Sequence, residues 1–248
     1  MIVIEGLTKS FEPTRRQRHL ALGDLSLSIA EGEFVSILGP SGCGKSTLLY
    51  VVGGFVPPTS GKVVVNGKAV TGPGPDRGPV FQEFALFPWK TVLGNVMYGL
   101  LEQGVPRALA ESKARALISL VHLAGYEDFY PKQLSGGMKQ RVAIARTLAY
   151  GPKILLMDEP FGALDPLTRA EMQDMLRGLL QRLKKTVLLV THDLDEALYL
   201  ADNIALLSEG KLVAHLKAED FLNSTQPEVQ SYVRAFHRGI KKAAEPRA

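Results

Sequence analysis

The fold is decided by one stretch of the sequence, Gly39-Pro40-Ser41-Gly42-Cys43-Gly44-Lys45-Ser46-Thr47. This stretch fits the phosphate-loop pattern G-x-x-x-x-G-K-[ST] without a mismatch. Residues 33–38 before it, which are mostly apolar, predict a short buried strand, and residues 46–52 after it predict the first turns of a helix. Strand, loop and helix in this order are the context that the motif requires. We therefore interpret the stretch as a phosphate loop rather than a glycine-rich turn that binds nothing.

The loop predicts a site for a nucleoside triphosphate and Mg²⁺. Its glycines let the backbone fold tightly around an anion, with successive N–H groups pointing inward. The N-terminus of the following helix adds partial positive charge at the same place. We expect Lys45 to reach the β- and γ-phosphates, the Ser46 hydroxyl to bind Mg²⁺, and Thr47 to donate to a neighbouring phosphate oxygen.

Composition and charge exclude several other classes of protein. The 248 residues are 46% hydrophobic and 22% charged, which is typical of a globular chain with one large domain or two closely joined ones. Cys43 is the only cysteine, so a disulfide within the chain is excluded and a reducing compartment is expected. We see no signal peptide and no apolar run near the ~20 residues of a membrane span. The net charge of +4 predicts a modestly basic, solvated surface, and without an aromatic and basic platform we expect no nucleic-acid partner.

Two apolar runs in the second half of the chain, residues 153–158 and 186–191, predict strands buried on both faces. Strands of this kind are typical of a parallel sheet, and a helix between them predicts a doubly wound α/β fold. The inner face of that helix is expected to carry Met172, Leu176, Leu179 and Leu183.

The rest of the chain departs from this α/β pattern in two places. Residues 2–29 predict antiparallel strands with a loop at 13–19. Residues 92–148 predict helices, which we interpret as an inserted subdomain. One of these helices should end at Gly125, with an apolar face made of Ala110, Ala114, Leu117, Val121 and Ala124.

Polar residues follow the predicted strands at the sheet edge where ligands bind in α/β proteins. Asp158 is placed to hold Mg²⁺, and Glu159 to polarise an attacking water as a general base. His192 follows the next buried strand and can orient the water at the γ-phosphate. Gln82 ends another strand and offers an amide to Mg²⁺ or water, although it can equally be an ordinary polar residue at a strand end.

A second anion site is predicted where Ser135-Gly136-Gly137 precedes a helix. Ser135 is a good N-cap, and the two glycines leave backbone N–H groups uncovered beside the positive end of the helix. By itself this pattern is most often only a helix cap.

Together these motifs resemble the nucleotide-binding domain of the ATP-binding cassette (ABC) transporter family over nearly the whole chain. Leu134 to Met138, continued by Lys139-Gln140-Arg141, resembles the family signature, which other phosphate-loop ATPases lack. By this resemblance Gly39 to Thr47 is Walker A, and Ile154 to Asp158 is Walker B. The remaining matches are the catalytic glutamate Glu159, the Q-loop glutamine Gln82, the D-loop Ala163-Leu164-Asp165 and the switch histidine His192. Phe11 takes the place of the aromatic residue that stacks on adenine, which is more often tyrosine in the family.

The resemblance implies a P-loop NTPase (RecA-like) core with an N-terminal antiparallel β-subdomain and an inserted α-helical subdomain. Residues 1–248 would form a single ABC ATPase domain, with the core and β-subdomain at 1–86 and 151–248 and the helical signature subdomain at 87–150. It also implies that two such domains pair head to tail. Ser135 to Gly137 of one domain would then cover the γ-phosphate of ATP held by Lys45 of the other, with the D-loop Asp165 at the same shared site.

The particular transporter is indicated by residues 75–89. Pro75-Asp76-Arg77-Gly78, Phe81-Gln82 and Leu86-Phe87-Pro88-Trp89 resemble the ATPases of nitrate, sulfonate and taurine importers. This resemblance implies a peripheral protein on the cytoplasmic face of the inner membrane, with a second ATPase subunit and a transmembrane permease as partners. A periplasmic or lipid-anchored solute-binding protein would take part indirectly. The alternative interpretation is a soluble ABC ATPase of the iron–sulfur assembly type, which needs no groove for a permease.

A further expectation concerns the reactivity of the Cys43 thiol. A thiol at a helix N-terminus should have a lowered pKa, so alkylation should inhibit the protein and ATP should protect it.

Overall fold

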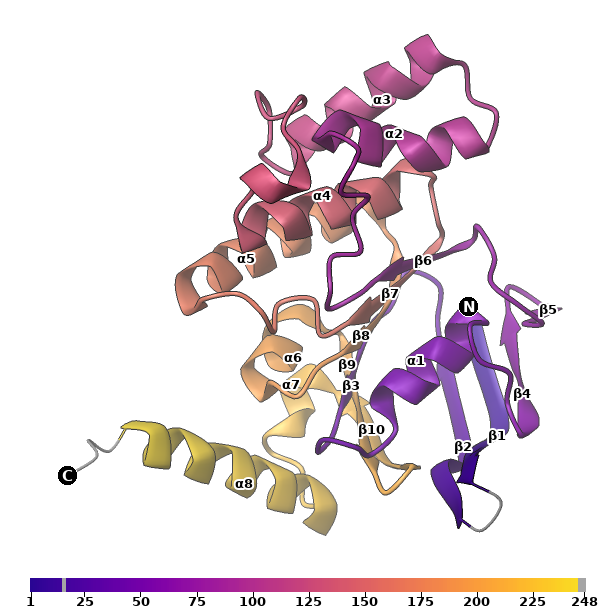
Figure 1. The fold of residues 1–248 in the computed structure, drawn as a ribbon. Coiled ribbons are helices and arrows are strands. Elements are labelled where there is room, and N and C mark those ends of the chain that lie inside the picture. The colour runs from indigo at the N-terminus through magenta and orange to yellow at the C-terminus, as the bar shows by residue number, and fades with distance from the viewer. Residues whose placement is uncertain (15–16, 245–248) are drawn as a thin grey trace. The chain divides into compact units, whose positions relative to one another are not determined.

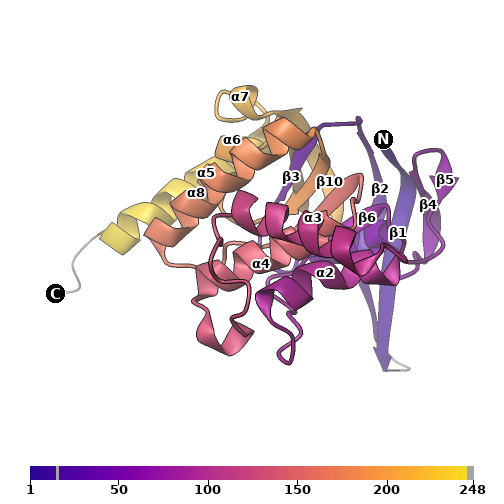
Figure 2. The same ribbon diagram turned by 90° about the horizontal axis from the view of Figure 1, so that it is seen from above.

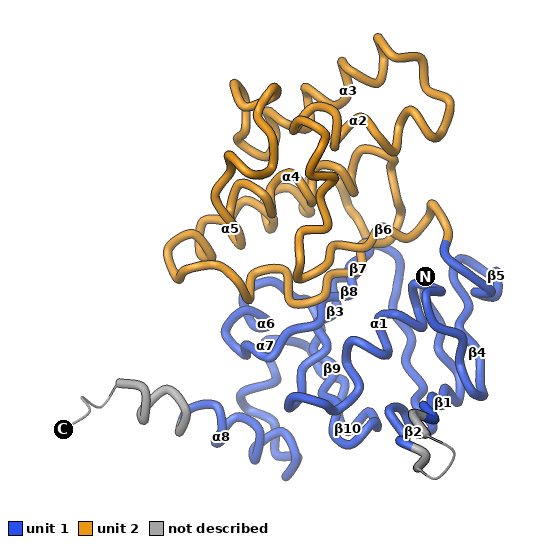
Figure 3. Tube along the Cα trace, in the orientation of Figure 1, with its two compact units in different colours: residues 1–73, 186–248 blue, residues 74–185 orange. Residues whose placement is uncertain are grey.

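The computed structural model describes residues 1–14 and 17–244 (Figure 1). Contacts divide the chain into two compact units (Figure 3): Met1–Pro73 with Thr186–Ala248, and Gly74–Lys185. Each unit has its own sheet strands, its own helices and its own apolar core. The second unit contains the helices expected at 87–150 together with two strands and one more helix.

An antiparallel sheet opens the first unit, as the sequence predicts. It has the strand order β2-β1-β4-β5. The loop expected at residues 13–19 is shorter than predicted, because the strands extend to Thr14 and resume at Gln17; residues 15 and 16 lie outside the described part of the chain. Asn66 and Gly67 both take positive φ, as a two-residue hairpin turn requires. The strands are β1 (Ile2–Thr14), β2 (Gln17–Ile29), β4 (Ser60–Val65) and β5 (Lys68–Ala69).

The first unit also contains a mixed sheet with the order β10-β9-β3-β8. β3 (Phe34–Leu38) runs parallel to β8 (Thr186–Val190) and to β9 (Asn203–Ser208). Every residue of β3 and β8 is buried, which confirms the short buried strand predicted before the phosphate loop and, for β8, the prediction of a strand covered on both faces. β10 (Lys211–Lys217) pairs antiparallel with β9 through the hairpin at Glu209 and Gly210. The helices of this unit are α1 (Lys45–Gly53), α6 (Leu194–Leu200), α7 (Ala218–Phe221) and α8 (Pro227–Ala244).

The second unit contains two parallel strands and most of the helices. β6 (Arg77–Val80) pairs with β7 (Ile154–Asp158), and all of β7 is buried. Figure 2 shows α2 and α3 side by side, and both pack on α4 around a core that includes Val96, Ile118 and Val142. The remaining elements are α2 (Val92–Glu102), α3 (Arg107–Leu120), the 3-10 turn Pro131–Gln133, α4 (Gly136–Ala149) and α5 (Pro166–Leu183).

Three details of the sequence prediction are wrong. α3 ends at Leu120 rather than at Gly125, because His122 takes a φ of 59° that interrupts the helix, and Ala124 is exposed. In α5 the buried face turns to Leu180, so Leu183 in the last turn is 37% exposed. Gln82 does not end a strand, because β6 stops at Val80 and Gln82 lies in the loop that follows.

Candidate functional site

The predicted site residues fall into two groups, one in each unit. The first unit holds the phosphate loop, Phe11 and His192, and the second holds Gln82, Asp158, Glu159, Asp165 and Ser135 to Gly137. Each group is built from its own strand ends and helix N-termini.

The phosphate loop connects β3 to α1 in a shape that only glycine permits. Gly39, Gly42 and Gly44 have φ of 151°, 79° and 105°. A Cβ on Gly39 would lie 2.3 Å from the carbonyl oxygen of Leu207, and one on Gly44 would lie 2.3 Å from that of Ala21. Gly44 is also the N-cap of α1, so it leaves the first N–H groups of the helix without a side-chain partner at this position. The loop therefore presents main-chain donors and the positive end of a helix to an anion.

Lys45 is the cation of this loop and is almost buried, with 6% of its surface exposed. Its Nζ donates to the carbonyl oxygens of Gly39 at 2.8 Å and Pro40 at 3.0 Å. These acceptors are neutral, so a phosphate oxygen would give the ammonium a stronger, charge-assisted hydrogen bond. Ser46 and Thr47 follow in the first turn of α1, where both are half-buried.

The expectation of a reactive Cys43 is wrong. The thiol is only 5% exposed, and burial raises its pKa although the positive charge of Lys45 acts in the opposite direction. The β9–β10 hairpin covers the loop here, since the amide of Gly210 donates to the carbonyl oxygen of Cys43 at 3.1 Å. For the pKa of the Cys43 thiol, the raising effect of desolvation therefore outweighs the lowering effect of the helix N-terminus.

We accordingly expect Cys43 to react slowly with iodoacetamide. A raised pKa leaves less thiolate at pH 8 than an ordinary cysteine has, and the rate should climb as the pH rises toward that pKa. The native protein should react about tenfold more slowly than the same protein in guanidinium chloride. Equal rates in the two states would contradict this expectation.

Phe11 lies on β1 with 38% of its surface exposed. The ammonium of Lys9 sits 4.9 Å from the centre of its ring. An exposed aromatic face beside a cation is suited to stacking against a flat, electron-rich base.

His192 occupies the turn between β8 and α6 and is exposed. The turn is fixed by hydrogen bonds: Thr191 Oγ1 donates to Glu196, and the Asp193 side chain caps α6 by accepting from the Glu196 amide at 3.1 Å. The main-chain oxygen of His192 accepts from the hydroxyl of Tyr232 at 3.3 Å. Sequence reasoning missed these supporting residues. The pattern Asp193-x-x-Glu196, an N-cap followed by an acid, was a signal for the cap of α6, whereas Tyr232 had no local signal.

In the second unit the structure brings Glu159 and Gln82 together. Asp158 ends β7 and is 7% exposed, and Glu159 follows it with the uncommon φ of 44°. A Cβ built on Gly162 would lie 3.7 Å from Glu159 Oε2 and 3.6 Å from Gln82 Nε2, so both side chains converge on this glycine. A carboxylate and an amide at the carboxyl end of a buried strand can together orient a water molecule.

The signature residues and the D-loop also lie side by side. Ser135 caps α4 by accepting from the amide of Met138 at 3.3 Å, which confirms its predicted place as N-cap. A Cβ on Gly137 would lie 2.5 Å from the Thr168 side chain in the first turn of α5. Asp165 caps α5 by accepting from the amide of Thr168 at 3.1 Å, and its hydrogen bonds to Thr168 lower its pKa. Two helix N-termini thus meet at Ser135 to Gly137.

Within residues 1–14 and 17–244, protein side chains alone do not form a metal site. Among the described residues no group of three His, Cys, Asp or Glu side chains could hold a metal ion. The expected ligands Ser46, Gln82 and Asp158 comprise one hydroxyl, one amide and one carboxylate. This donor set fits Mg²⁺, which proteins usually bind through one or two carboxylates together with substrate phosphates and water.

Comparison with known proteins identifies the family of this chain. The family described as ABC transporter matches residues 22–162. The chain therefore belongs to the ABC transporter family, and it is an ATPase cassette of that family. Among the residues that the structure describes, no helix has the length and apolar character needed to cross a membrane.

Two curated relatives are similar over most of their length. An uncharacterized ABC transporter ATP-binding protein of Methanocaldococcus jannaschii is 53% identical over 205 residues, covering 83% of this chain and 76% of the relative. The taurine import ATP-binding protein TauB of Pseudomonas entomophila is 50% identical over 200 residues, covering 80% and 77%.

The fold is shared with solved cassettes. An ATP-binding cassette solved as a dimer in a post-hydrolysis state with ADP and Pi superposes with a TM-score of 0.77 at 35% identity, covering 88% of this chain and 99% of that chain. A second dimeric structure, of a bacterial ABC transporter cassette, gives a TM-score of 0.78 at 36% identity.

Proposed function

We propose that this chain is the ATP-binding subunit of an ABC importer that takes up a small sulfonate such as taurine, or a similar anion such as nitrate, through a separate permease. The similarity to taurine import ATP-binding proteins, about 50% identical over four fifths of the chain, carries this proposal. The subunit would act at the cytoplasmic face of the inner membrane, with a solute-binding protein on the other side of the permease. This similarity favours the importer over a soluble ABC ATPase of the iron–sulfur assembly type.

The nucleotide is held by the first unit. The N–H groups from Gly39 to Thr47 cradle its phosphates, and Lys45 exchanges its carbonyl acceptors for the β- and γ-phosphate oxygens. Phe11 stacks on the adenine, and the exposed face of its ring beside Lys9 supports this role. Ser46, Gln82 and Asp158 are the residues that would hold Mg²⁺, and the ion would supply positive charge to neutralise the phosphates.

Hydrolysis is assigned to three side chains. Glu159 accepts a proton from the attacking water as general base, and the convergence of Glu159 and Gln82 on Gly162 supports a shared task in orienting that water. His192 donates a hydrogen bond to the γ-phosphate and holds the water in line.

A second copy of the chain completes the site. Residues 135–137 of that copy, at the N-terminus of α4, cover the γ-phosphate. Asp165 lies next to them. ATP bound between the two copies therefore stabilises the dimer. Hydrolysis destabilises the dimer because the γ-phosphate contacts are lost. The dimeric form of the solved cassettes supports this arrangement.

The permease contact is assigned to the segment from Phe84 to Trp89. The side chain of Asn95 fixes this segment by hydrogen bonds. It accepts from the Phe87 amide at 2.9 Å and donates to the carbonyl oxygens of Lys90 and Thr91. Arg146 anchors it further, through the carbonyl oxygens of Phe84 and Ala85. Sequence reasoning missed both anchors.

Trp89 is the exposed tip of this segment. It is 71% exposed and lies against Phe87 with a distance of 5.7 Å between ring centres. A rigid, exposed aromatic of this kind is suited to be an anchor in a protein interface.

We expect Trp89→Ala to uncouple the subunit from its permease. An aromatic anchor at an interface is typically worth 2 kcal/mol or more, so binding to membranes that contain the permease should weaken about thirtyfold. The ATPase rate of the isolated subunit should not change, because Trp89 lies outside the residues assigned to ATP. Co-sedimentation with those membranes measures the first effect, and unchanged co-sedimentation would contradict the assignment.

Deletion of the gene tests the proposed transport. The deletion strain should lose growth on taurine or a related sulfonate as sole sulfur source, or on nitrate as sole nitrogen source, and should grow normally on sulfate and ammonium. The wild-type gene should restore growth and the Glu159→Gln variant should not. Normal growth of the deletion strain on taurine, on other sulfonates and on nitrate would refute the proposed substrates.

A further inference from the structure

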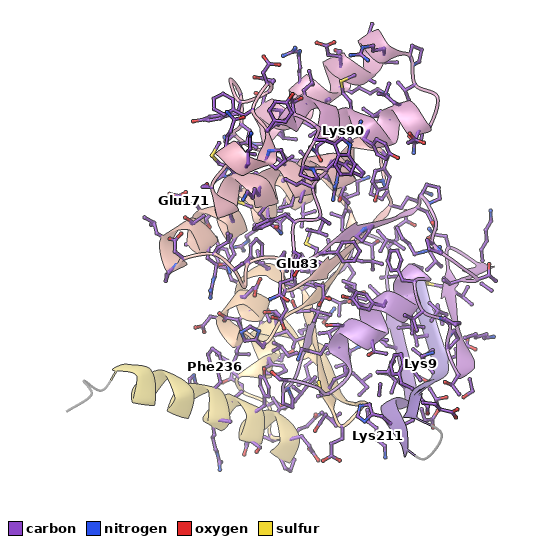
Figure 4. All side chains as sticks on the ribbon, in the orientation of Figure 1. Lys9, Glu83, Lys90, Glu171, Lys211 and Phe236 are labelled. Carbon is purple, nitrogen blue, oxygen red and sulfur yellow. The ribbon has the colours of Figure 1, made fainter. Side chains whose placement is uncertain are left out.

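The C-terminal helix α8 packs on the elements that carry both the phosphate loop and His192. Its apolar face follows a helical spacing, with Val229 fully buried and Tyr232, Val233 and Phe236 packed against the same cluster. Figure 4 labels Phe236 on this helix. The cluster includes Leu38, the last residue of β3 before the phosphate loop, and two residues of α6, Leu194 and Ala197. The helix therefore packs against β3 and α6, the elements next to the phosphate loop and the His192 turn.

Tyr232 is the residue of α8 that reaches the loops themselves. Its hydroxyl donates to the main-chain oxygen of His192 at 3.3 Å. The same side chain is close enough to Gly39, Cys43 and Asp193 for each of them to influence its pKa, which burial raises to about 12. The hydroxyl is consequently a protonated donor throughout the physiological pH range.

The packing around Tyr232 is incomplete on the side of the phosphate loop. A cavity of about 550 Å³ lies beside α8, lined by Pro40 of the phosphate loop, by residues of β9 and β10, and by Glu228, Ser231 and Tyr232 of the helix. Because this cavity lies between α8 and Pro40, side-chain packing alone does not fix the helix against the phosphate loop there. The hydrogen bond of Tyr232 is thus a specific connection between α8 and the His192 turn.

We infer that Tyr232 is a positioning residue for ATP hydrolysis, which fixes the backbone of His192 relative to the phosphate loop. The inference rests on the proposed role of His192 at the γ-phosphate. A fixed backbone keeps the imidazole in the orientation that the transition state needs, and ground-state binding of ATP by the phosphate loop does not depend on it. Loss of the hydroxyl should therefore lower kcat and leave KM unchanged.

The test compares Tyr232→Phe with Ser231→Ala in the purified full-length chain. The first variant keeps the ring and its packing and removes only the hydroxyl. The second removes a hydroxyl from the neighbouring residue, which lines the same cavity. We expect kcat of Tyr232→Phe to fall about three- to tenfold, the range for one hydrogen bond, with KM for ATP within about twofold of wild type. Ser231→Ala should match the wild type in both constants.

A double-mutant cycle with His192→Ala separates this inference from the role of His192. If the hydroxyl acts through His192, Tyr232→Phe should have no further effect on kcat once His192 is replaced. An unchanged kcat in Tyr232→Phe, or a full additional loss in the double variant, would overturn the inference. Full activity of His192→Ala alone would instead refute the role proposed for His192.

Discussion

Glu159→Gln is expected to reduce the rate of ATP hydrolysis by about 10²–10⁴-fold while ATP binding is retained. Glutamine has nearly the shape of glutamate but cannot accept the proton of the attacking water. The residue lies directly after the buried β7, and its side chain converges with Gln82 on Gly162, so the substitution changes the chemistry with little change in packing. Because the γ-phosphate is not removed, ATP should hold two copies of the variant together.

Release of phosphate and binding of a fluorescent ATP analogue measure these two effects. Glu171→Gln is the matched control, since the Glu171 side chain is 61% exposed and its nearest cation, Arg141, is 3.8 Å away. That control should hydrolyse ATP at the wild-type rate. Hydrolysis by Glu159→Gln within about tenfold of wild type would exclude Glu159 as the general base.

Lys45→Ala is expected to weaken ATP binding about ten- to a hundredfold. The Lys45 ammonium is buried and is the charged group that the loop offers to the β- and γ-phosphates, and a charged hydrogen bond is worth about 1.5–3 kcal/mol. Removal of the side chain also leaves the carbonyl oxygens of Gly39 and Pro40 without this donor. A second variant, Lys45→Met, keeps the apolar stem and should lose the same affinity if the charge is responsible.

Isothermal titration with ATP measures the affinity of both variants. Lys62→Ala is the control, because Lys62 pairs with Glu5 on the exposed surface of the antiparallel sheet. Surface pairs of this kind contribute little, so its ATP affinity should equal that of the wild type. Wild-type affinity in Lys45→Met would show that the ammonium does not bind the phosphates.

The sequence was sufficient to predict the elements that local patterns encode. β7 and β8 were recognisable as near-continuous apolar runs, and both are fully buried. The Ser135 cap depends on short-range chemistry, so its residue type was enough. The order of the motifs along the chain was enough to identify the family.

Features that depend on contacts between distant segments could not be predicted. Cys43 has the helix N-terminus that should lower its pKa, but the β9–β10 hairpin buries it and reverses the shift. The bond from Tyr232 to His192 joins residues forty positions apart and has no local signature. Leu183 fits the apolar period of α5, yet it is exposed because the buried face of the helix turns to Leu180. Local rules therefore fail where tertiary burial decides the outcome.

The dependence of ATPase activity on protein concentration tests the shared site most directly. If one copy holds the triphosphate and a second copy supplies Ser135 to Gly137, the rate per molecule should fall steadily as the protein is diluted below its dimerisation constant. Addition of excess Glu159→Gln protein to a dilute sample should alter that rate, because the variant can still supply the covering residues. A rate per molecule that stays constant over the whole dilution series would contradict the shared site.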